Sequence, residues 1–322
     1  MKRILALPWL LAGLVGLFAA AGCERDSTED PPPGVGSTEQ SAMKYYAEND
    51  EFVKNDEQTF SDRDIEPADY GTFGEIQVGI TPLRFGRFIR NVSTTVTVEI
   101  QPGDSLAVAH VAKVITGVFK IRAVNSNGDT VLIEKQFTDN ANRNLIFKRV
   151  DRRVDRFWEN WRPVATSLVA GATVQTSTPV AITKLQLFTA TGDTITVTDP
   201  TSYYLRFPWR RIFAGGRLDV PEFRAGQRLI ILATVVSSSP DTDFVALRFG
   251  AGPMQRRRQR MMLVSEVNNG NGTFTREFQA SFLMHVHPGF FHAGVDAMTR
   301  GTLFDDTAPY SVSWWGVPYR VF

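Results

Sequence analysis

The stretch Thr94-Thr95-Val96-Thr97-Val98-Glu99-Ile100 alternates strictly between polar and apolar positions. Successive side chains of a β-strand point to opposite faces, so this alternation predicts a strand with one buried and one solvated face. The same pattern recurs in residues 131–135 and 194–198. Turn sequences such as Asn127-Gly128-Asp129 separate these stretches, and Asn-Gly tolerates the positive φ angles of a tight hairpin. Many short strands joined in this way predict an all-β chain.

Two segments break the period of two. Residues 41–60 carry apolar residues among acids and lysines, and we expect one short helix there. In residues 150–161 the apolar side chains fall at i, i+4, i+7, i+8 and i+11, which is one face of an amphipathic α-helix that ends before Pro163. We expect its aromatic face to pack on its own domain; the alternative is that it lies in a membrane interface.

The strand pattern predicts two consecutive β-sandwich domains, in residues 71–215 and 216–322. The expected strands of the second are 228–236, 244–249, 261–267, 273–283, 289–296 and 310–321. Their number and spacing resemble the cysteine-free immunoglobulin-like modules of bacteria. The resemblance implies an immunoglobulin-like sandwich for the second domain.

The N-terminus carries an export pattern. Lys2 and Arg3 precede an apolar stretch, residues 4–18, which is too short to span a bilayer comfortably, and small residues lead to Cys23. Ala19-Ala20-Ala21-Gly22-Cys23 resembles the lipobox of bacterial lipoproteins, with Ala at position 20 where Leu is usual. The resemblance implies that residues 1–22 are removed, that the Cys23 thiol carries diacylglycerol and that its amine is acylated. No other cofactor is expected.

Residues 23–40 contain a single aliphatic residue, Val35, and three consecutive prolines, so we expect a disordered tether. Residues 41–70 form the expected helical lead-in to the body. Glu24 follows the cysteine, and by the sorting rule of lipoproteins this implies the outer membrane rather than the inner membrane. The expected location is therefore the bacterial cell envelope, with the membrane as a partner through the lipid anchor.

Composition limits the possible partners and chemistry. Without residues 1–22 the chain has 33 basic and 34 acidic residues, and this balance argues against nucleic acid as a partner. Cys23 is the only cysteine, so no internal disulfide can form. The motifs of serine hydrolases, P-loop enzymes, zinc proteases and dithiol enzymes are missing from the sequence.

One dense basic run, Arg256, Arg257, Arg258 and Arg260, is a candidate for binding phosphate head groups, lipopolysaccharide or acidic glycans. The competing interpretation, which we favour, is a solvated strand edge that discourages sheet-to-sheet pairing.

The aromatic pair Trp314-Trp315 lies in the last expected strand, so the two rings must face opposite sides. We expect one ring in the core, and the other is a candidate for stacking on a sugar or another ligand. The competing interpretation, which we favour, is core and interface packing.

Metal ligation has two weak sets of candidates. His285, His287 and His292 offer imidazoles, but no matching carboxylate is identifiable, so no metal is predicted. Asp305-Asp306 and Asp241-x-Asp243 could supply oxygen ligands for calcium, although neither run has the length of a calcium-binding loop.

The sequence favours a non-catalytic envelope lipoprotein that acts as a binding or scaffold module for an envelope polymer, such as an acidic glycan, or for an envelope protein. One alternative is an extracytoplasmic metal-dependent or carboxylate enzyme acting on glycan. Another is a structural subunit of an envelope assembly, in which a strand pairs with a neighbour.

Overall fold

The computed structural model describes residues 34–55, 66–67, 79–154, 156–175, 179–188, 194–206, 221–250 and 257–322, and residues 34–322 form one compact unit. The expected signal segment, Cys23 and most of the expected tether lie outside the described residues.

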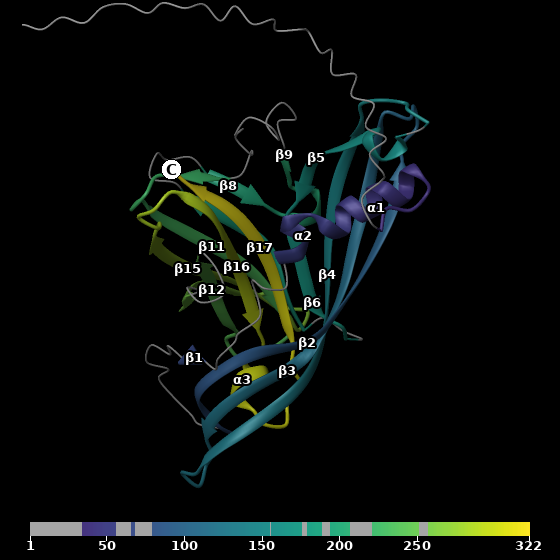
Figure 1. Cartoon of the computed structure of the whole chain (residues 1–322). Helices are drawn as coiled ribbons and strands as arrows, with labels where there is room; N and C mark the ends of the chain where they lie inside the picture. Colours follow the sequence, from purple (N-terminus) through teal and green to yellow (C-terminus); the bar gives the residue numbers. More distant parts are fainter. Residues whose placement is uncertain are drawn as a thin grey trace, which may run out of the picture. The chain divides into compact units, whose positions relative to one another are not determined.

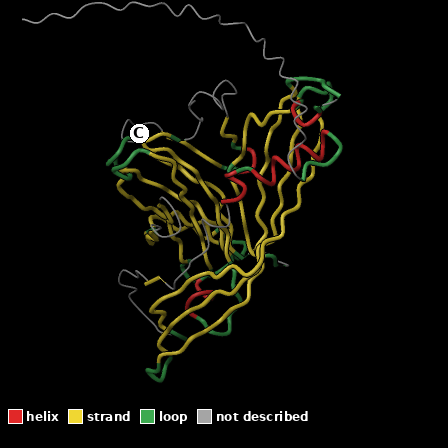
Figure 2. The backbone as a smooth tube through the Cα atoms, viewed as in Figure 1, coloured by secondary structure: helices red, strands yellow, loops and turns green. Residues whose placement is uncertain are grey.

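Strands dominate the described chain (Figures 1 and 2). The helical elements are α1 (Glu39–Asn49), α2 (Glu51–Asn55), α3 (Arg300–Phe304) and the 3-10 turns η2 (Phe157–Glu159) and η3 (Pro200–Ser202). Among the described residues, no helix is long and apolar enough to cross a membrane. The strands are β1 (Glu66–Pro67), β2 (Thr81–Ile100), β3 (Leu106–Val124), β4 (Thr130–Arg149), β5 (Trp161–Ser167), β6 (Val169–Thr173), β7 (Val180–Phe188), β8 (Thr194–Val197), β9 (Tyr204–Arg206), β10 (Glu222–Phe223), β11 (Arg228–Ser237), β12 (Phe244–Gly250), β13 (Arg257–Arg260), β14 (Met262–Asn268), β15 (Phe274–Leu283), β16 (Gly289–Met298) and β17 (Val312–Val321).

These strands form two sheets. The larger has the order β1-β2-β3-β4-β6-β17-β16-β12-β13, with β5, β9 and β10 paired beside this path. The smaller has the order β14-β15-β11-β7-β8. Long antiparallel hairpins account for much of the larger sheet, because β2 and β4 each have 20 residues and β3 has 19.

The smaller sheet packs on one face of β12, β16 and β17 (Figure 1). Alternate residues of β11, including Leu229, Ile231 and Val235, meet alternate residues of β16 and β17 such as Val295 and Val317 in one apolar cluster. This arrangement is a two-layer β-sandwich, in which each strand places every second side chain between the layers.

The opposite face of β12, β16 and β17 is also buried. It packs against β2, β3 and β4 through a second cluster that contains Phe85, Phe119, Phe137, Phe244 and Trp314. Because both faces of β17 are covered, nearly all of its residues are buried. A third cluster packs α1 and α2 onto the remaining length of β3 and β4.

The prediction of an all-β sandwich chain is confirmed. The alternating stretches lie in β2, β4 and β8, except for Thr198, which follows β8, and the expected hairpin glycine Gly128 has a positive φ angle of 86°. Two short helices, α1 and α2, stand where one was expected in residues 41–60, and α1 begins at Glu39, inside the expected tether.

The two sandwiches do not follow one another along the chain, and this corrects the expected arrangement. β7, from the expected first domain, pairs with β11 of the second, and β6 pairs with β17. The strands after residue 216 do span both layers, but β7 and β8 complete one layer and β6 continues the other. The sandwich is therefore not an independent immunoglobulin-like domain of residues 216–322.

The amphipathic helix expected over residues 150–161 is replaced by an irregular segment and the short turn η2. Trp161 pairs with Arg149 as the first residue of β5 and is buried against α1. Val154, expected on the buried helix face, is 94% exposed. Backbone pairing with β4 stabilises the segment around Trp161 more than a helix of 12 residues would, because so short a helix is only marginally stable.

Candidate functional site

Two of the predicted site residues, Cys23 and Arg256, lie outside the described residues. The neighbouring arginines lie on β13, at one end of the larger sheet. The Arg258 guanidinium stacks on the Phe85 ring at 3.6 Å and donates a 3.0 Å hydrogen bond to the Phe85 carbonyl on β2. Arg260 lies 5.9 Å from the ring of Phe244. Arg258 thus connects the end strand β13 to β2, and its contacts favour a structural role over the candidate phosphate or glycan site.

The two tryptophans face opposite sides of β17, as predicted, but both are buried, with 1% exposure for Trp314 and 6% for Trp315. Trp314 belongs to the cluster under β2–β4, and Trp315 belongs to the sandwich core. Gly171 on β6 makes room for the Trp314 ring, since a Cβ at position 171 would lie 2.1 Å from it. Neither ring is therefore available to stack on a ligand, because β17 is covered on both faces, and core packing, the favoured interpretation, accounts for both.

The three histidines do not converge. His285 stacks on Phe291 at 4.0 Å and shares a 3.0 Å hydrogen bond with the Tyr319 hydroxyl. Phe291 and His292 are neighbours on β16 and point to opposite faces, so His285 and His292 lie on opposite sides of that strand. His287 is exposed in the turn before β16. Among the described residues, no group of three or more His, Cys, Asp or Glu side chains could hold a metal ion.

Two of the four aspartates weighed for calcium, Asp305 and Asp243, are bonded to neighbouring residues of the fold. Asp305 accepts hydrogen bonds from the Thr307 backbone and hydroxyl, and these bonds lower its pKa. Asp243 is buried and accepts from Arg276 at 2.7 Å and from Ser237 at 2.9 Å. Both carboxylates therefore stabilise the fold.

A buried polar cluster that the sequence did not predict connects strands far apart in the chain. Asp296 on β16 forms ion pairs with Arg87 on β2 and with Arg248 on β12. Asp139 on β4 accepts a hydrogen bond from the Tyr310 hydroxyl. Burial raises the pKa of Asp139 to about 6, against the opposing effect of the Arg87 charge. The residues that pair in this cluster are 48 to 209 positions apart in the sequence, so no local pattern indicates the cluster.

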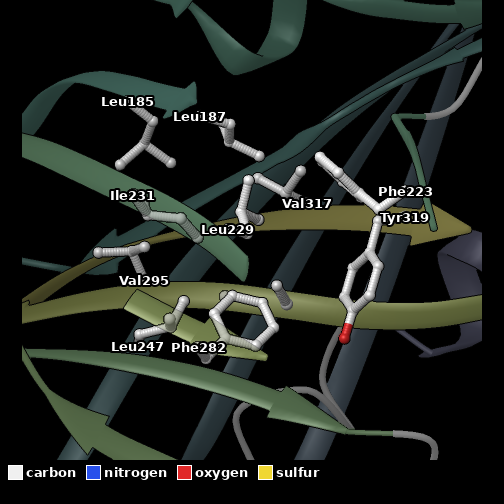
Figure 3. A pocket seen from close by; sticks show the side chains of 12 residues that line it. Leu185, Leu187, Phe223, Leu229, Ile231, Leu247, Phe282, Val295, Val317 and Tyr319 are labelled. Carbon is white, nitrogen blue, oxygen red and sulfur yellow. The ribbon is translucent and has the colours of Figure 1, made fainter. Parts of the chain in front are cut away.

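A small apolar cavity lies inside the sandwich (Figure 3). Its lining includes Leu187, Leu229, Phe282, Val317 and Tyr319, and the Tyr319 hydroxyl is the only side-chain oxygen among the lining residues. The cavity volume is about 10 Å³. That is room for one water at most, so this cavity is a packing void of the core.

A larger, open cavity of about 370 Å³ lies at the start of α1. The arginines that line this cavity are paired with acidic side chains. The Glu39 carboxylate accepts two 2.8 Å hydrogen bonds from Arg149, one from Asn160 at 2.7 Å and one from the Trp161 indole at 2.9 Å. Arg153 pairs with Glu159 at 3.3 Å. This network fastens α1 to β4 and β5.

The edge strand β14 differs from every feature above in being apolar and uncovered. All seven of its residues are exposed, including Met262 at 62%, Leu263 at 42%, Val264 at 56% and Val267 at 58%. β14 pairs with β15 on one side, and within the described chain no strand pairs with its other side. The sequence did not indicate this, because Met261-Met262-Leu263-Val264 has the composition of a buried strand.

Edge strands usually carry devices that prevent pairing, such as proline, inward charges or bulges. β14 has one bulge, near Val264, and a single charge, Glu266, which is paired with Arg276 at 2.6 Å. It contains no proline. Its open side therefore presents backbone N–H and C=O groups, flanked by apolar side chains, to an incoming strand.

No protein-family model matches this chain, and no curated protein matches it either. What the β14 edge can bind follows from its own geometry and chemistry.

Proposed function

We propose that this chain is a non-catalytic binding or scaffold lipoprotein of the bacterial cell envelope, and that it binds a protein partner at the open edge of β14. The observation that carries this proposal is the exposure of all seven residues of that edge strand, four of them aliphatic or methionine. Strand addition uses such an edge: backbone hydrogen bonds contribute affinity, and alternate side chains contribute specificity.

The chemistry of the edge favours a protein over a glycan. Sugar rings are bound by exposed aromatic faces, and β14 has only aliphatic, methionine and polar side chains. Trp314 and Trp315, the residues best suited to stacking on a sugar, are buried. Met262, Leu263 and Val267 suit the side chains of an apolar strand.

The anchor sequence supports the proposed location. Lipid on Cys23 with two or three acyl chains gives stable membrane attachment. Ten residues separate Cys23 from Gly34, where the described body begins, and a fully extended segment of that length spans about 35 Å. A partner in the same membrane is then within reach of the body.

The anchor and the edge are tested separately in bacteria. A Cys23→Ser variant is expected to leave the membrane fraction and to lack the mass of the acyl chains in mass spectrometry. If the variant lacks acyl groups and still stays in the membrane fraction, the lipid anchor is contradicted.

For the edge, a photo-crosslinking amino acid replaces Val267 in the full-length chain. The matched control carries it at Thr196, on β8 at the other end of the same sheet. Protein adducts at position 267 and none at position 196 are expected. No adduct at 267, or equal adducts at both positions, would overturn the proposal.

A further inference from the structure

Resting on the proposed function, we infer that the partner strand at this edge is β14 of a second copy of the chain, paired antiparallel about a twofold axis. The pairing joins two five-stranded sheets into one continuous sheet. It closes after two copies, because each copy contributes the same edge.

The two faces of β14, together with the charge of Glu266, favour one register. Met262 pairs with Gln279, and Val267 pairs with Thr275. These β15 partners lie on the outer face of the sheet, opposite the buried row. Leu263 lies opposite Phe278 and therefore has the inner orientation.

Glu266 shares that inner face, opposite Arg276. A twofold axis between Val264 and Ser265 places Met262 opposite Val267 of the second copy, outer against outer. It also places Leu263 opposite Glu266, inner against inner. A shift of one position would set outer residues against inner ones, as in Met262 opposite Asn268.

The charges permit this register. Glu266 is the only charged residue of β14, so no two like charges lie opposite one another. Its carboxylate is already neutralised by Arg276. Two Met262–Val267 contacts form across the axis, and apolar cross-strand pairs of this kind stabilise a sheet.

The other open edge of the smaller sheet is a poorer partner. β8 has four residues, and Asp199 follows shortly as the cap of η3, so the strand cannot extend. Pairing of β14 with β8 would also produce an open-ended chain of copies instead of a closed dimer. Attachment of both copies to one membrane raises their effective concentration for self-pairing.

Engineered cysteines test the register directly. The chain without residues 1–23 retains every described residue and has no cysteine. Met262→Cys and Val267→Cys variants are prepared separately and then mixed under mild oxidation. In the inferred register these two positions face one another at about 5 Å between Cβ atoms, whereas position 262 of one copy lies about 17 Å from position 262 of the other.

The mixture is expected to form at least about tenfold more disulfide-linked dimer than either variant alone, since only opposed thiols meet disulfide geometry. A mixture of Met262→Cys with the control Thr196→Cys is expected to form no more than the single variants. Equal cross-linking by the single variants would overturn the register.

The second readout is the molar mass in solution, measured by size-exclusion chromatography with light scattering. The parent is expected to elute as a dimer and a Val267→Lys variant as a monomer with an unchanged circular dichroism spectrum. A parent that stays monomeric, together with a Val267 photo-adduct to a different protein, overturns the inference and leaves the proposed function standing. A monomeric parent without any adduct at position 267 overturns both.

Discussion

The Glu266 carboxylate on β14 accepts a 2.6 Å hydrogen bond from Nε of Arg276, a side chain that is fully buried. Arg276 also donates to Asp243 at 2.7 Å and to the carbonyls of Ser239 and Pro240, each at 3.0 Å. A single guanidinium thus joins the exposed edge strand to the interior of the smaller sheet. The edge is open, but its position is fixed.

Replacement of Arg276 by Met is expected to lower the free energy of unfolding by about 3–5 kcal/mol, because it leaves the buried Asp243 carboxylate without its ion-pair partner. Arg228→Met is the control, since Arg228 lies at the exposed start of β11 and is expected to change stability by less than about 0.5 kcal/mol. Urea unfolding of both variants measures the difference. Equal stability of the two would show that the Arg276 network does not hold the sheet.

The raised pKa of Asp139 makes stability depend on pH. The folded state retains the Asp139 proton up to a pKa of about 6, whereas an unfolded aspartate loses it near 3.8. The folded state therefore binds more protons in this window, and the parent loses stability as the pH rises from about 4 through about 6.

Asp139→Asn removes this titration. The stability of the parent relative to Asp139→Asn is expected to fall by about 1–3 kcal/mol between pH 4 and pH 8. Denaturant unfolding of both proteins across this range measures the change. A constant difference would mean that Asp139 ionises in the folded state as it does in an unfolded chain.

Glu39 connects α1 to the larger sheet through Arg149, Asn160 and Trp161. Glu39→Ala is expected to cost about 1–3 kcal/mol, since it leaves the partly buried Arg149 without one of its charged partners. Amide exchange of α1 is expected to speed up as the helix loosens. Glu48→Ala, on the exposed side of the same helix, is the control and should leave both readouts nearly unchanged. Indistinguishable effects of the two variants would contradict this role.

Local patterns predicted the strands, because alternation and turn chemistry act over a few residues. The pattern at residues 94–100 and the turn at Gly128 are examples, and both are confirmed. The helix prediction for residues 150–161 was wrong because Trp161 takes its backbone partner, Arg149, from across the sheet. Spacing along the chain does not contain that information.

The candidate site depends on which surfaces remain uncovered, and composition does not reveal coverage. Residues 262–264 and Trp314 are all apolar, yet the former lie on an open edge and the latter is enclosed between two layers. Arg87 and Asp296 are separated by 209 residues, so their pairing follows only from the folded topology.

Close packing at Gly171 gives a test of the β6–β17 junction. Gly171→Ala places a methyl group against the buried Trp314 ring and is expected to destabilise the protein by about 1–3 kcal/mol. Gly289→Ala is the matched control, because its added Cβ would meet Phe291 at an ordinary 3.4 Å. Thermal unfolding compares the two. A Gly171→Ala protein as stable as the control would show that β6 and β17 are not packed this closely.

The central claim is that a partner strand occupies the open edge of β14. Amide hydrogen exchange of residues 262–268, measured on the full-length chain in bacterial membranes, tests it most directly. We expect exchange to be at least about tenfold slower in the parent than in Val267→Lys, with residues 194–197 of β8 unchanged, because strand pairing protects edge amides. Equal exchange of residues 262–268 in the two proteins would contradict the claim.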